Sequence, residues 1–152
     1  MTKPTPTTMR NPKLEISTDG GTTWTDISGF FSAISADGSE RPTGEAYVAT
    51  DDTAVMGVGK RPPQKLTITV IYTEGALEAY TLLETAWRNA TPTQLRLSPR
   101  GANSGDNIFT FGEDGMGYVT KAVPPAGEVS SADPVAIEFG YAAPDYTITQ
   151  AV

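Results

Sequence analysis

The sequence predicts a mainly β fold, a β-sandwich or barrel of two antiparallel sheets with one flanking α-helix. Abundant Thr, together with 15 glycines and 12 prolines, is typical of strands joined by many turns. Several short segments alternate apolar and polar residues, which is the period of a half-buried strand. One segment, residues 76–89, has helical spacing instead. The length of 152 residues fits a single domain, which we place at residues 13–143.

The first part of the chain is predicted to hold an arm and a hairpin. Residues 1–12 are rich in Thr and Pro and lack an apolar period, so we expect a flexible N-terminal arm. Leu14 and Ile16 alternate with polar neighbours, which predicts a short strand. The turn at residues 19–21 then leads into a second strand, and residues 30–34 form a further apolar stretch.

The clearest strand and the single helix follow one another. In residues 65–72 one face of the strand carries Leu66, Ile68, Val70 and Tyr72. In residues 76–89 the larger apolar residues recur at helical spacing, at Leu77, Tyr80, Leu83 and Trp87, and Ala76, Ala79 and Ala86 fill in the same stripe. This stripe is predicted to pack on the core.

The last third returns to strand signals. Strands are predicted at residues 94–98, 107–111, 116–123 and 135–142, which gives about seven strands in the chain. Residues 144–152 are expected to form an extended C-terminal tail.

The most unusual segment is the insertion at residues 36–63, which has 28 residues and no apolar period. Such a segment is uncommon inside a compact domain. Its Tyr47, Val55 and Met56 can bury apolar surface, unlike a disordered linker. Doubled back as a hairpin, it would reach about 40 Å, well beyond a domain radius of gyration of about 15 Å. We therefore expect an arm that contacts neighbouring subunits and is mobile before it does so.

Composition excludes several function classes. The chain has no cysteine and no histidine, which removes disulfides, thiol nucleophiles, the commonest general base and the usual zinc ligands. It has no secretory leader and no apolar run of membrane-spanning length, so we expect a soluble protein that is not exported. Residues 101–152 hold seven acids against Lys121 alone, and so supply −6 of the net charge of −7. This balance disfavours binding to the phosphate backbone of nucleic acid.

Residues 17–24 fit the S-x-D-x-G-x-x-W pattern called the Asp-box, which occurs once here. In sialidase propellers this motif recurs in each blade and lies away from the catalytic site. We expect Asp19 to accept turn N–H groups, Gly21 to supply unusual dihedral angles and Trp24 to pack under the hairpin. The prediction is a structural hairpin.

No catalytic, metal or cofactor site is predicted. Asp51 with Asp52, and Asp106 with Glu113 and Asp114, offer oxygen atoms for calcium, but neither group fits the calcium-loop pattern. We interpret them as solvated turn acids. Residues 57–61 (GVGKR) lack both the P-loop spacing and a following helix.

Three runs of sequence resemble the major tail tube proteins of long, non-contractile-tailed bacteriophages. They are residues 24–29 (WTDISG), 38–47 (GSERPTGEAY) and 59–75 (GKRPPQKLTITVIYTEG). The strand that follows residues 117–120 (GYVT) is similar as well, so the resemblance covers most of residues 22–142. It implies a β-sandwich with a flanking helix, six-membered rings that stack into a hollow tube, and passage of the genome through that tube. The Asp-box hairpin departs from the family pattern.

The resemblance also implies roles for particular residues. Subunit and ring contacts are expected in the arm, at Arg41, Glu45, Tyr47, Asp51, Asp52 and Met56. An acidic lumen gives DNA no counterion-releasing grip, so lumen-facing acids are expected at Glu113, Asp114 and Glu138, with the helix outside the lumen sheet.

The implied partners are the chain itself and other tail proteins such as the tape measure, terminator and distal tail proteins. DNA would pass through without specific binding, and no membrane or cofactor is implied. The protein would be made in the cytoplasm of the host bacterium and end in the virion.

Two other functions stay open. A carbohydrate-binding module is suggested by a β-sandwich with exposed Trp and Tyr and an Asp-box. Within the phage setting, the chain could instead be a tail terminator or a head-decoration protein. An enzyme is the least favoured class, because no catalytic constellation is found.

Overall fold

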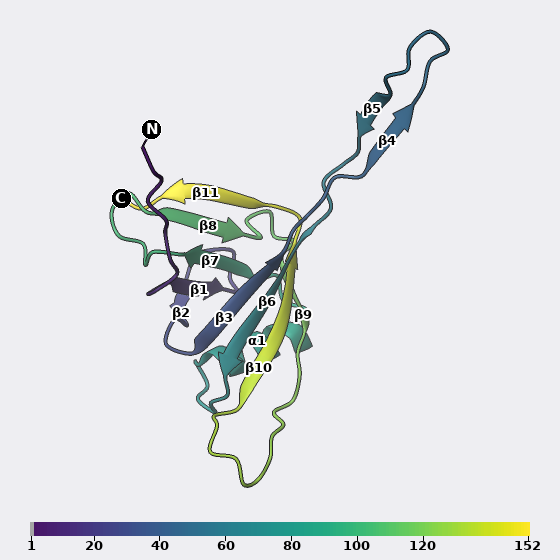
Figure 1. Ribbon diagram of the computed structural model, residues 1–152. Helices are drawn as coiled ribbons and strands as arrows, with labels where there is room; N and C mark the ends of the chain where they lie inside the picture. Colours follow the sequence, from purple (N-terminus) through teal and green to yellow (C-terminus); the bar gives the residue numbers. More distant parts are fainter. Residues whose placement is uncertain (1) are drawn as a thin grey trace.

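The computed structural model describes residues 2–152 and consists of two β-sheets, one helix and a projecting two-stranded arm (Figure 1). The elements are β1 (Lys13–Ser17), β2 (Thr25–Asp26), β3 (Phe31–Asp37), β4 (Thr43–Ala46), β5 (Val55–Val58), β6 (Gln64–Ile71), α1 (Ala79–Arg88), β7 (Gln94–Ser98), β8 (Asn107–Phe111), β9 (Tyr118–Lys121), β10 (Ala136–Ala143) and β11 (Tyr146–Gln150). The mainly β, sandwich-like prediction is confirmed.

Two sheets of antiparallel strands enclose the core. The five-stranded sheet has the order β11-β8-β7-β1-β2, and the four-stranded sheet has the order β3-β6-β10-β9. Their facing sides supply Leu14, Ile16, Leu95 and Phe111 from one sheet and Leu66, Ile68, Val70, Ile137, Phe139 and Tyr141 from the other. The alternation in β6 is the pattern that the sequence predicts, because Leu66, Ile68 and Val70 are all buried.

The helix is shorter than predicted, and its buried stripe is narrower. α1 begins at Ala79 and not at residue 76, and the carboxylate of Glu78 accepts a hydrogen bond from the Gly75 N–H at 3.0 Å, which holds the preceding turn. Leu77 lies before the helix and is 77% exposed, and Trp87 is 40% exposed, so these two do not belong to the core. The buried residues of the helix are Ala79, Leu83 and Ala86, which all belong to the predicted stripe and are spaced at i, i+4 and i+7.

The C-terminal segment is a strand, not an extended tail. β11 pairs with β8 in register from Tyr146 opposite Phe111 to Gln150 opposite Asn107, and it forms one edge of the five-stranded sheet. Tyr146 and Ile148 alternate with threonines in the sequence, but every residue of β11 is exposed, so this strand adds no fully buried side chain to the core. At the other end, residues 2–10 are exposed and form no helix or strand; their flexibility stays a prediction. Residue 1 lies outside the described residues.

Candidate assembly surfaces

The insertion at residues 36–63 forms a hairpin that projects away from the sandwich (Figure 1). β3 and β6 run side by side up to its base, so two paired strands of the sheet lead directly into it. Beyond the base, β4 and β5 pair from Thr43 opposite Val58 to Ala46 opposite Val55. This pairing is more regular than the sequence indicates, because both strands are short and have no buried face.

Backbone and side-chain contacts define the base of the arm. Gly59 donates its N–H to the Pro42 carbonyl oxygen at 2.7 Å, and Arg41 Nη1 donates to the Gly59 carbonyl oxygen at 3.2 Å. A Cβ on Gly59 would lie 2.6 Å from Pro42 Cγ, so this close approach requires glycine. Arg61 Nη2 lies 2.7 Å from Asp145 Oδ2, which ties the base to the connection between β10 and β11. Both side chains of that pair are about half exposed, so its contribution to stability is small.

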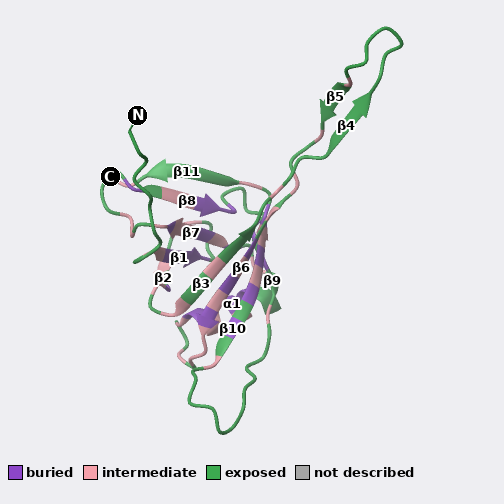
Figure 2. Cartoon of the chain, viewed as in Figure 1, coloured by how far each residue is buried: buried purple, intermediate pink, exposed green. Residues whose placement is uncertain are grey.

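Beyond its base, the arm exposes most of its surface (Figure 2). The exposed fractions of its large apolar side chains are 66% for Tyr47, 51% for Val48, 58% for Val55, 67% for Met56 and 64% for Val58. An isolated two-stranded sheet is only marginally stable in water. The arm therefore presents an apolar surface that the sandwich itself does not cover.

The predicted contact residues occupy three different parts of the arm. Glu45 and Met56 are opposite each other in the two strands, and so lie on the same face. Asp51 lies at the tip, where its Oδ1 accepts the Thr53 N–H at 3.0 Å and shapes the turn, next to exposed Asp52. Arg41 is at the base. Whether these residues contact another subunit stays a prediction.

The second notable surface is the outer face of the four-stranded sheet. Glu138 is opposite Thr69, and Thr69 is opposite Ala33, so these residues share the face that points away from the core. Most of its other side chains are small or polar, among them Ser35, Thr67, Gly140 and Ala142. Its charges nearly balance, because Asp37 and Glu138 are accompanied by Lys65 and Lys121. The helix packs on the opposite, core-facing side, where Tyr80 lies 5.8 Å from Phe139 between ring centroids.

The three predicted lumen acids are not brought together. Glu138 is on that outer face, whereas Glu113 and Asp114 lie in the turn between β8 and β9. Glu113 Oε2 accepts the Thr147 hydroxyl at 3.0 Å, and Asp114 Oδ1 accepts the Met116 N–H at 3.0 Å. Both acids of this turn therefore have local hydrogen-bonding roles.

The Asp-box hairpin has the predicted local structure. Asp19 Oδ1 accepts the Thr23 N–H at 2.9 Å and the Ser17 hydroxyl at 2.8 Å, and Gly21 has φ +88°. The hydrogen bond from Thr23 is the largest cause that holds the pKa of Asp19 below its ordinary value. Trp24 is half-buried, and the guanidinium carbon of Arg96 lies 4.1 Å from its ring centroid. The Asp19 carboxylate therefore finds its hydrogen-bond donors within the hairpin itself.

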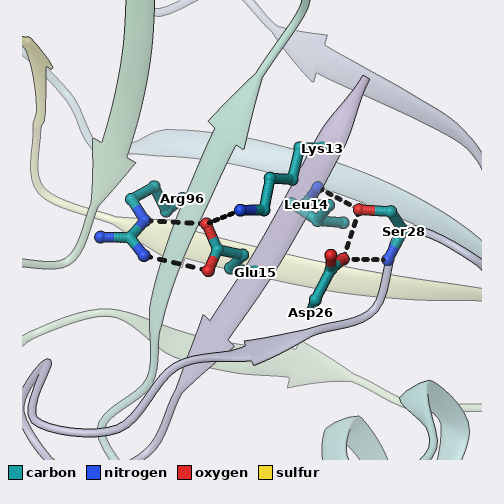
Figure 3. Close-up of polar contacts among 6 residues, drawn as sticks. All are labelled: Lys13, Leu14, Glu15, Asp26, Ser28 and Arg96. Carbon is teal, nitrogen blue, oxygen red and sulfur yellow. Dashed lines mark hydrogen bonds and ion pairs between the residues drawn. The ribbon is translucent and has the colours of Figure 1, made fainter. Parts of the chain in front are cut away.

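A polar cluster that sequence reasoning missed lies beside this hairpin, on the outer face of the five-stranded sheet (Figure 3). Arg96 donates through Nε and Nη2 to the two carboxylate oxygens of Glu15 at 3.2 and 3.0 Å, and Lys13 Nζ approaches the same carboxylate at 3.5 Å. Glu15 is almost fully buried, so this bidentate pairing satisfies a charge that would otherwise be costly. Strand alternation places Glu15 on this face, but no sequence signal identifies a partner 81 residues away.

Asp26 and Ser28 complete the same corner (Figure 3). The Ser28 hydroxyl donates to Asp26 Oδ1 and accepts the Leu14 N–H at 2.9 Å, so it links the end of β2 to β1. Burial raises the pKa of Asp26, but the hydrogen bonds from Ser28 outweigh it and bring the pKa below its ordinary value.

Within residues 2–152, no group of three or more acidic side chains is arranged to hold a metal ion. No helix in the same range is long and apolar enough to cross a membrane.

Several solved structures share this architecture over nearly the whole chain. A chain in the sheath–tube complex of the extracellular contractile injection system PVC has a TM-score of 0.71 and 15% identity, with 97% of this chain and 93% of that one covered. A chain in the tube-terminating cap of the anti-feeding prophage has a TM-score of 0.70 and 15% identity, with coverage of 99% and 95%. The SPP1 tail tube has a TM-score of 0.66 and 12% identity, with coverage of 97% and 81%.

The chain has the tail tube fold. The same fold occurs in a sixfold-symmetrised anti-feeding prophage baseplate and in a gene transfer agent tail refined with C6 symmetry. No protein-family model matches the sequence, and no curated protein matches it either. At identities of 12–15%, this chain and these structures share the arrangement of helices and strands, and the likeness does not extend to individual residues.

Proposed function

We propose that the chain is a structural protein that assembles into stacked hexameric rings and forms the hollow tail tube of a phage particle, through which DNA is delivered. The observation that carries the proposal is the agreement of the whole chain with tube and cap chains of tail-like particles at TM-scores of 0.66 to 0.71. The sixfold symmetry of two assemblies that contain this fold supports a hexameric ring. The proposed partners are further copies of the chain and other tail proteins, and the proposed location is the virion.

The arm is the proposed contact between subunits. It combines reach with uncovered apolar surface, and a hairpin of this kind gains stability when a neighbour covers it. Tyr and Arg are favoured as anchors in interfaces, which supports Tyr47 and Arg41 as contact residues beside Met56. Glu45, Asp51 and Asp52 would add polar contacts at the edge of the same interface.

The outer face of the four-stranded sheet is the proposed lumen surface. Small polar side chains and nearly balanced charge give a phosphate backbone little to bind, so DNA could slide without being held. Of the predicted lumen acids, Glu138 lies on this face beside Asp37, whereas Glu113 and Asp114 would line the lumen only near the β8–β9 turn. The helix, on the core-facing side of the sheet, would lie away from the lumen.

Replacement of residues 40–58 by an Asn-Gly turn tests this function. Nearly all of these residues are exposed, so the shortened chain is expected to keep its circular dichroism spectrum and melting temperature but to stay monomeric in sedimentation. Met56→Asp should weaken assembly in the same way, and Met116→Asp is the matched control because Met116 is similarly exposed but lies outside the arm. Tubes formed by the shortened chain would contradict the arm as the contact between subunits.

A tube-terminating cap is the second candidate. The anti-feeding prophage cap matches as well as the tube chains do, with a TM-score of 0.70, so the fold by itself serves both roles. A terminator would form single rings at every protein concentration, whereas a tube subunit would form stacks whose length grows with concentration. Electron microscopy of a concentration series separates the two.

A carbohydrate-binding module receives less support. Such modules offer sugars a free aromatic platform, but one face of the Trp24 ring is occupied by the guanidinium group of Arg96. Trp24→Ala should therefore destabilise the hairpin, and neither the wild type nor the variant should bind sugars.

A further inference from the structure

An apolar groove of about 320 Å³ opens between the two sheets. Its apolar lining comes from both sheets and consists mainly of Ile34, Leu66, Leu97, Phe109, Phe111 and Tyr146. Leu66 and Phe111 are core residues, so the groove is a place where the hydrophobic core reaches the surface. A side chain placed there would bury apolar area against several partners at once.

The groove is bordered by two unpaired sheet edges. β3 is the end strand of the four-stranded sheet, β11 is the end strand of the five-stranded sheet, and residues from both line the groove. Unpaired edges present free N–H and C=O groups, to which another strand can pair. The chemistry of the site therefore suits a β-strand or hairpin that carries apolar side chains.

The chain's own N-terminal segment covers the groove only in part. Met9 lines it, along with two adjoining hollows, yet remains 47% exposed. Within the described residues, no backbone–backbone hydrogen bond joins residues 2–10 to the sandwich. Thr7 and Arg10 each line one of these adjoining hollows. A segment held by a few side chains at the surface is easily displaced.

The arm has the properties that this groove requires. It is a two-stranded hairpin, its apolar side chains are uncovered, and it carries a flexible methionine, Met56, that is 67% exposed. It projects away from the sandwich, and no residue of 40–58 lines the groove of the same chain (Figure 1). The complementary hairpin must therefore come from another copy.

We propose that the groove between β3 and β11 binds the arm of a second copy of this chain, and that Met56 of that arm displaces Met9. This inference rests on the proposed self-assembly and specifies where the arm binds. The N-terminal segment then acts as a temporary cover that keeps the groove occupied until a neighbour arrives. Assembly exchanges a weak contact within the chain for a larger one between chains.

Cysteine cross-linking between full-length chains tests the proposal cleanly, because the chain has no native cysteine. One variant carries Met56→Cys and the other Ala36→Cys, at an exposed groove position on β3 opposite Leu66. The two are mixed, treated with a short bismaleimide and analysed by mass spectrometry of the linked peptides. The matched control replaces Ala36→Cys by Ser131→Cys, which is exposed in the distant connection between β9 and β10.

The expected result is a strong link between residues 56 and 36 and little or none between residues 56 and 131. Adding Met9→Ser to the groove partner should raise the yield of the cross-link at limiting protein concentration by about fivefold. The half-buried Met9 side chain would then no longer compete with Met56 for the groove. An unchanged yield would refute the displacement of Met9.

The possible outcomes separate this inference from the proposed function. Tubes in electron micrographs without the 56–36 link would overturn the groove as the binding site and leave the tube function standing. The link without rings or tubes would support the groove and overturn the tube function. Absence of both would overturn both.

Discussion

The hydroxyl of Tyr141 joins the two sheets at a single buried point. It extends from β10 and donates to the Thr93 carbonyl oxygen at 2.6 Å, with the Phe111 carbonyl oxygen at 3.3 Å. A Cβ on Gly112 or Gly117 would lie 2.5 or 2.1 Å from this hydroxyl oxygen, so both positions must remain glycine. Burial, together with the charge of Asp114, raises the pKa of Tyr141, so it stays a hydrogen-bond donor at ordinary pH.

Tyr141→Phe is expected to lower the free energy of unfolding by about 1–2 kcal/mol, because it leaves a buried carbonyl without its donor. Urea denaturation of the isolated monomer measures the effect. Tyr118→Phe, at an exposed position, is the matched control and should change the value by less than about 0.5 kcal/mol. Equal effects of the two substitutions would contradict this role for the hydroxyl.

Asp19 makes the hairpin sensitive to acid. Its pKa is lowered, mainly by the Thr23 N–H and then by the Ser17 hydroxyl, so its ionised form stabilises the fold above the unfolded-state pKa of about 3.9. That contribution disappears as the pH falls through the lower pKa of the folded state. Asp19→Asn should therefore destabilise the protein at pH 7, and its difference from the wild type should shrink as the pH falls through the lowered pKa of the folded state.

Thermal melts from pH 2 to pH 7 measure this difference, with Asp133→Asn in an exposed loop as the control. A deficit of Asp19→Asn that is the same at pH 2 and pH 7 would mean that the charge of Asp19 plays no part.

At the scale of elements, α1 contributes to the core through a narrower face than its sequence indicates. Leu83 is fully buried, whereas Leu77 is 77% exposed. Leu83→Ala should therefore cost about 2–5 kcal/mol, and Leu77→Ala should stay within about 0.5 kcal/mol of the wild type. Denaturant unfolding of the two variants compares them directly, and a large cost at Leu77 would favour the longer helix.

The elements that could be predicted are those with one buried face. β6 and the strands at residues 94–98 and 107–111 were predicted closely, because burial gives them a period or clear boundaries. The start of α1 was misplaced because apolar Leu77 continues the helical spacing before the helix begins. The strands β4 and β5 have no buried residue, and their sequences show no alternation of apolar and polar residues. In β11, Tyr146 and Ile148 do alternate with threonines, but nothing in this segment identifies its pairing partner β8.

The candidate site was predictable in outline only. Length and composition identified residues 36–63 as an arm, because local sequence records both. The groove combines Ile34, Leu97, Phe109 and Tyr146, which are brought together only by the topology of the two sheets. The pairs Glu15–Arg96 and Arg61–Asp145 span 81 and 84 residues, and nothing in local sequence joins them.

The two ends of the molecule differ in shape. The arm projects from one end, and the long connection between β9 and β10 extends from the other (Figure 1). A subunit with different surfaces at its two ends associates head to tail, which yields either a closed ring or an open stack. The outward arm and the partly covered groove suit such a repeating contact.

Assembly into stacked rings can be checked by electron microscopy of the purified full-length chain after concentration. We expect rings with sixfold symmetry that stack into hollow tubes and lengthen as protein concentration rises. A strictly monodisperse monomer at high concentration would contradict it.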